Sequence, residues 1–92
     1  MELEEDFGLL CKYINEMGGA HMCIITPKRF SQYLKEKRGI GVSAPQAYFR
    51  LYRLHKFLIE NSVEIEGWRY VGERKVGSWG LVFVRENGGD VG

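Results

Sequence analysis

The pattern of apolar and polar positions along the chain predicts three amphipathic helices. Over residues 3–17, apolar side chains recur every three or four positions, which places them on one face of a helix. Thr26 and Pro27 are typical of a helix start, so a second helix is expected over 27–38. The third and longest helix is expected over 43–61, with a core stripe of Ala47, Leu51, Leu54 and Leu58.

Glycine and capping residues mark the ends of these helices. Gly18-Gly19 and Gly39 follow the first and second helices, and glycine readily takes the left-handed conformation that favours a helix end. Ser43 is the expected N-cap of the third helix, and Pro45 falls in its first turn, where the missing N–H costs little. The second and third helices are therefore joined by a tight connection.

Shorter segments predict strands. Residues 21–25 form a short apolar segment compatible with a strand, and residues 65–71 and 79–85 alternate as two antiparallel strands do. Residues 72–78 between them form a glycine-bounded loop, and the glycine-rich tail 87–92 is expected to fray. Since no repeat, low-complexity segment or linker interrupts the 92 residues, residues 1–92 are expected to form one α+β domain.

The net charge of +1 conceals an uneven distribution of charged residues. Residues 1–27 hold one base and five acids (net −4), residues 28–56 hold eight bases and one acid (net +7), and residues 57–92 hold four bases and six acids (net −2). DNA-binding proteins carry their Lys and Arg residues on one side of the molecule. The basic middle third, which covers the second helix and most of the third, therefore indicates a nucleic-acid surface.

Other classes of protein find little support. No segment approaches the roughly 20 apolar residues of a membrane span, and the N-terminus is acidic, unlike a signal peptide, so a cytoplasmic, nucleoid-associated protein is expected. No catalytic elbow or phosphate-loop motif is present, and the Cys and His residues lack zinc-site spacing. We expect no enzyme activity, catalytic residue, metal, cofactor or small-molecule ligand. Cys11 and Cys23 suit two small buried side chains, with a disulfide as the alternative.

The order of helix, short strand, helix, tight turn, helix and hairpin resembles the winged helix-turn-helix family of DNA-binding domains. The resemblance covers residues 3–86 and rests on the order of elements rather than on a diagnostic motif. It implies a helix-turn-helix over about 27–61, with the third helix in the major groove, and a β-hairpin wing over about 65–86 against the backbone or minor groove. The third helix is longer than usual, so its last turns, 54–61, are expected in the core or against a second subunit.

Candidate DNA contacts follow from side-chain chemistry. Gln46 and Arg50 suit base edges, because Gln pairs with adenine and Arg with guanine near the start of a groove-bound helix. Phosphate contacts are expected from Lys28, Arg29, Ser43, Tyr48 and Arg53, and at the wing from Arg74 and Lys75.

Each of these side chains also has a simpler interpretation. Cations on a helix often form only a solvated face, and cations at a hairpin tip protect against aggregation. The aromatic residues Trp68, Tyr70 and Trp79 suit cross-strand pairs, with stacking on single-stranded bases as the alternative. His55 is interpreted as a partly buried helix residue.

These features together predict a sequence-specific protein that binds double-stranded DNA, as a small homodimeric transcriptional regulator. A single module buries little DNA, so a dimer is expected, with its surface on the first helix at Leu3, Phe7, Leu10 and Ile14. One alternative is a plasmid partition or architectural protein that coats DNA by spreading. Another is a winged-helix module that binds proteins and not DNA.

Overall fold

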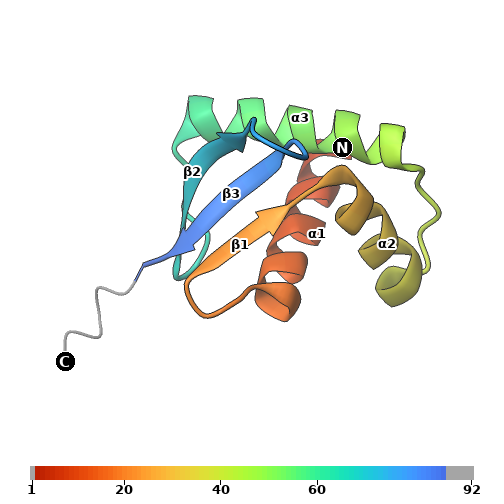
Figure 1. Cartoon of the computed structure of the whole chain (residues 1–92), viewed down its shortest axis with the longest axis horizontal. Coiled ribbons are helices and arrows are strands. Elements are labelled where there is room, and N and C mark those ends of the chain that lie inside the picture. Colours follow the sequence, from red (N-terminus) through yellow and green to blue (C-terminus); the bar gives the residue numbers. More distant parts are fainter. Residues whose placement is uncertain (1, 87–92) are drawn as a thin grey trace.

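Three helices and three strands form the described part of the chain. A computed structural model describes residues 2–86. Its elements are, in chain order, α1 (Glu2–Met17), β1 (Met22–Ile25), α2 (Pro27–Arg38), α3 (Ala44–Asn61), β2 (Trp68–Arg74) and β3 (Gly80–Arg85) (Figure 1). All three expected helices are confirmed to within one residue. The tail expected to fray, 87–92, lies outside the described residues.

The hairpin strands begin later than the alternation predicts. Ile65 forms only an isolated bridge with Trp68, because the chain turns between them at Gly67, which has a φ of 79°. The strand β2 therefore starts at Trp68 and continues through Arg74, so residues 72–74, expected in the loop, belong to the strand. A register shift between Tyr70 and Gly72 accommodates this continuation.

The sheet is antiparallel with the order β1-β3-β2, so the last strand lies in the centre. Cys23 pairs with Phe83 on one side of β3, and Tyr70 pairs with Phe83 on the other. Leu81 and Phe83 point into the core, as their alternation predicts. Figure 1 shows α3 running along the top of the molecule, with the end of the β2–β3 hairpin beside it.

The core lies between the sheet and the three helices. It includes Leu10 and Ile14 of α1, both almost completely buried within the chain. These two residues were expected at a dimer surface, and that expectation is wrong because α1 directs its apolar face into the core. Leu3 and Phe7 are only partly buried. The last turns of α3 also contribute to the core, through Leu54 and Leu58.

Gly18 is needed at the end of α1 for a different reason from the one expected. Neither Gly18 nor Gly19 is among the residues with a positive φ. A Cβ atom at Gly18 would instead lie 2.5 Å from the carbonyl oxygen of Ile14 and 2.9 Å from the ring of Trp68. Gly39, with a φ of 66°, does take the expected left-handed conformation.

Two further features of the structure are the state of the two cysteines and the apolar length of the helices. Cys11 and Cys23 are free thiols, of which Cys23 is buried as expected and Cys11 is only partly buried. Burial raises the pKa of Cys23 to about 11. Within residues 2–86, no helix is both long enough and apolar enough to cross a membrane.

Candidate nucleic-acid interface

The cations at the start of α2 and at the end of the hairpin lie around one cavity. This cavity has a volume of about 470 Å³ and is lined by Lys28 and Arg29 from α2 and by Arg74 from β2. Trp79, just before β3, completes the hairpin side of its wall. The three cationic residues are exposed to solvent. The fold therefore gathers cations that are far apart in the sequence.

Two helices begin at the same cavity, because Pro27 and Ala44 are among the residues that line it. The hydroxyl of Thr26 caps α2 by accepting a hydrogen bond of 3.2 Å from the backbone N–H of Arg29. Neither α2 nor α3 has an acidic residue in its first turn. The partial positive charge of both helix N-termini therefore adds to the charge of the side chains.

Ser43 and Gln46 form a capping box at the start of α3. The Ser43 hydroxyl accepts from the backbone N–H of Gln46 at 3.2 Å, and the Gln46 side-chain Oε1 accepts from the backbone N–H of Ser43 at 2.9 Å. The Ser-x-x-Gln spacing is a known sequence signature of this arrangement, although only the Ser43 cap was predicted. The oxygen atoms of both side chains are thus engaged within the helix cap.

Arg50 and Arg53 face α1 and contact a carboxylate there. The Nη1 atom of Arg50 donates a hydrogen bond of 2.8 Å to Oδ1 of Asp6, and Nη2 of Arg53 lies 3.9 Å from Oδ2. Asp6 is completely buried, unlike the exposed Glu4 and Glu5 beside it. A base contact by Arg50 would therefore compete with its ion pair.

Aromatic side chains cover the outer surface of α3 beside the hairpin. The Trp79 ring packs edge-on against Tyr48, with ring centroids 4.8 Å apart. Trp79 was expected to pair across the strands, and this is wrong because it precedes β3 and turns toward α3. Tyr52 stacks on Tyr48, and Phe49 is 66% exposed. Sequence reasoning missed Phe49, although its position opposite the predicted core stripe signals an exposed ring.

A polar network behind these rings ties the hairpin to α3. The Nδ1 atom of the buried His55 lies 2.7 Å from the hydroxyl of Tyr70, and its Nε2 lies 3.4 Å from Oε2 of Glu73. The indole N–H of Trp79 donates a 2.8 Å hydrogen bond to Oε1 of Glu73, which lowers the pKa of Glu73. Burial raises the pKa of Tyr70. The network holds Trp79, and with it the end of the hairpin, at a fixed position against α3.

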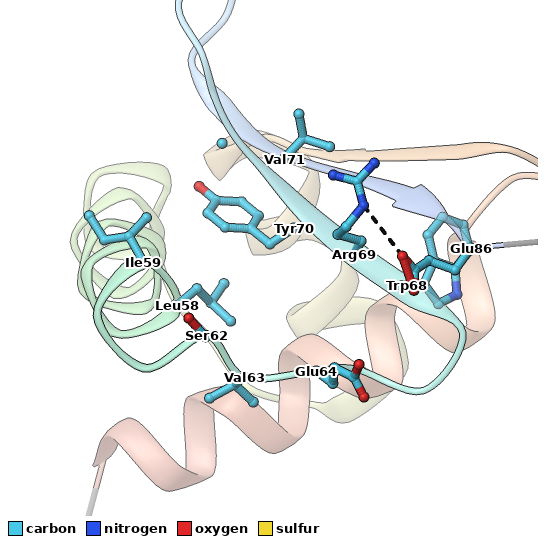
Figure 2. A pocket seen from close by; sticks show the side chains of 11 residues that line it. Leu58, Ile59, Ser62, Val63, Glu64, Trp68, Arg69, Tyr70, Val71 and Glu86 are labelled. Atoms are coloured by element: carbon cyan, nitrogen blue, oxygen red, sulfur yellow. Dashed lines mark ion pairs between the residues drawn. The ribbon is translucent and has the colours of Figure 1, made fainter. Parts of the chain in front are cut away.

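A second cavity, of about 460 Å³, lies at the other end of α3. Figure 2 shows its side chains coming from the end of α3, residues 62–64 and β2. Glu64 and Glu86 line it, and its only basic residue, Arg69, lies 3.4 Å from Glu86. This cavity is therefore poorly suited to a polyanion. In the described part of the chain, no group of three or more His, Cys, Asp or Glu residues could hold a metal ion.

No protein-family model, curated protein or solved structure matches the chain.

Proposed function

We propose that the protein binds double-stranded DNA, with α3 and the β2–β3 hairpin against the duplex. The observation that carries the proposal is the single cavity at which Lys28, Arg29 and Arg74 meet the N-termini of α2 and α3. Lys and Arg residues that neutralise phosphates release counterions from DNA, and this release supplies much of the binding free energy. Helix N-termini add N–H donors for phosphate oxygens.

The architecture is compatible with a winged helix-turn-helix domain. Three helices pack with a three-stranded antiparallel sheet, and the hairpin ends beside α3 (Figure 1). In this proposal α2 and α3 form the helix-turn-helix and the hairpin is the wing. Lys28, Arg29, Arg74 and Lys75 contact phosphates, whereas Arg50 serves mainly to neutralise Asp6.

The specific form of the proposal is a sequence-specific transcriptional regulator that acts as a homodimer. Leu3 and Phe7 retain a partly exposed apolar surface, and with Phe57 they line a cavity of about 360 Å³. This surface could receive a second copy, and sedimentation of the purified protein would show whether it does. A footprint confined to one palindrome supports a regulator, whereas a footprint that grows with protein concentration supports DNA coating.

Charge-removal variants test the proposed surface. Binding of a fluorescent duplex is measured for Lys28→Ala with Arg29→Ala, for Arg74→Ala, and for the control Arg69→Ala. Arg69 is a similarly charged, exposed residue at the second cavity. We expect the α2 double variant to bind at least about tenfold more weakly and to lower the salt slope by about 2, with Arg74→Ala lowering it by about 1. The proposal is wrong if Arg69→Ala weakens binding as much as the site variants, or if the wild type binds no duplex.

A further inference from the structure

The outward surface of α3 is aromatic where it meets the hairpin. We define the aromatic face as Tyr48, Phe49, Tyr52 and Trp79. Phe49 is the most exposed of its four side chains, and Tyr48 and Tyr52 are also open to solvent. Contiguous exposed apolar groups on a small protein mark a surface that binds a partner or ligand.

The aromatic face is held in place before any partner arrives. Tyr48 lies at its centre, with ring centroids 4.8 Å from Trp79, 5.5 Å from Phe49 and 6.1 Å from Tyr52. Trp79 is itself fixed by its hydrogen bond to Glu73. Side chains fixed in this way lose little conformational freedom on binding.

The charges around the aromatic face favour a polyanion over a second copy of the chain. Lys56 lies two turns after Phe49 on α3, Arg74 lines the same cavity as Trp79, and Lys75 follows Arg74 at the hairpin end. A two-fold dimer through this face would bring the same surface of each copy together, so that cations would face cations. A nucleic acid would meet no such repulsion, because its phosphates are negatively charged.

The side chains best suited to hydrogen-bonding base edges are engaged elsewhere. The Oε1 atom of Gln46 accepts from the cap of α3, and Arg50 is bonded to Asp6. What α3 presents at the centre of its outer surface is the ring of Phe49, with Tyr52 on the following turn. In the major groove of DNA, the apolar group available to such rings is the C5 methyl of thymine.

We infer that Phe49 and Tyr52 contact thymine methyl groups in the major groove and make the protein prefer thymine-containing sites. This inference rests on the proposed function, because it requires α3 to lie in that groove. It assigns to Phe49 a role in specificity that is separate from the role of the cations in affinity.

Replacing thymine by uracil tests the inference directly, since uracil keeps the same hydrogen-bonding groups but lacks the methyl. The affinity of the whole chain is measured for an A·T-rich duplex and for the same duplex containing uracil. We expect the thymine duplex to bind about threefold to fivefold more tightly for each methyl contacted. Phe49→Ala should remove most of this preference, and the fold should be kept because the ring lies outside the core. Ile59→Ala changes another exposed apolar residue of α3, beside the second cavity, and should keep the preference.

The outcomes separate the inference from the proposed function. Equal binding of both duplexes, with a steep salt dependence, overturns the inference and leaves the proposed function standing. Absence of any duplex binding overturns both. A thymine preference that survives Phe49→Ala, or tighter binding of single strands that depends on Phe49, also overturns the inference, because the ring would then not act through thymine methyl groups.

Discussion

The ion pair between Arg50 and Asp6 shows how one buried carboxylate can determine the role of a neighbouring basic side chain. Asp6 is fully buried in α1, whereas 28% of the Arg50 side chain remains exposed. A buried carboxylate without a charged partner is costly, because it has lost its hydration. The main effect of Arg50 is therefore on folding, and it stabilises the contact between α1 and α3.

Replacing Arg50 should reveal this structural role. We expect Arg50→Ala to lower the free energy of unfolding by about 3 kcal/mol, since it removes a charged contact of 2.8 Å from a buried carboxylate. Urea unfolding followed by tryptophan fluorescence measures the change. Arg69→Ala is the control and should cost about 1 kcal/mol or less, because its ion pair with Glu86 is 3.4 Å long and joins two exposed side chains.

The expectation for Arg50 fails if both variants lose the same small amount of stability. The double variant Asp6→Ala with Arg50→Ala provides a further check. Its loss should be smaller than the sum of the two single losses, because the two side chains interact.

At the level of single residues, the sequence predicts which side chains are buried better than it predicts which side chains form ion pairs. The apolar spacing correctly places Leu51, Leu54 and Leu58 in the core. The pairing of Asp6 with Arg50 joins residues on different helices, and only the packing of those helices brings the two together. The helical spacing does place Asp6 on the apolar side of the first helix, three residues after Leu3 and four before Leu10, but it does not identify the partner of the carboxylate.

At the level of elements, the hairpin is positioned through Glu73 and Trp79. The indole N–H of Trp79 donates to Glu73, and His55 of α3 approaches the same carboxylate. These contacts favour the ionised carboxylate, so the pKa of Glu73 in the folded protein lies below its ordinary value of 4.5. The resulting stabilisation is fully present above pH 4.5 and is lost as the pH falls through the lower folded pKa.

Trp79→Phe should raise the pKa of Glu73 toward its ordinary value, because the ring is kept but the hydrogen-bond donor is removed. Carboxyl ¹³C shifts recorded across a pH titration measure the change. Lys75→Ala is the comparison and should raise the pKa less, since the ammonium group lies 3.8 Å away and is largely exposed. A Glu73 midpoint that is no lower in the wild type than in Trp79→Phe would contradict this account.

The limits of the helices were more predictable than those of the strands. Capping residues act locally, so Thr26, Gly39 and Ser43 could be recognised from the sequence alone. The start of β2 depends on a turn at Gly67 and on pairing with β3, which are set by the rest of the sheet. The position of Trp79 against α3 likewise depends on how the hairpin meets the helix.

At the level of the whole molecule, the distribution of charge matters more than its sum. The sequence shows a basic middle third within a chain of net charge +1. The fold adds Arg74, from outside that third, to the cavity that Lys28 and Arg29 line. The cations near the duplex in our proposal therefore come from the start of α2 and the end of the hairpin. The aromatic face lies where α3 meets the hairpin.

The most direct test of the proposal is the affinity of the wild-type chain for a short duplex, measured over a range of salt concentrations. Three or four phosphate contacts from Lys28, Arg29, Arg74 and Lys75 predict that the logarithm of the binding constant falls with the logarithm of salt concentration, with a slope of about −3 for each bound chain. An affinity that does not change with salt, or the absence of binding at low salt, would contradict the proposal.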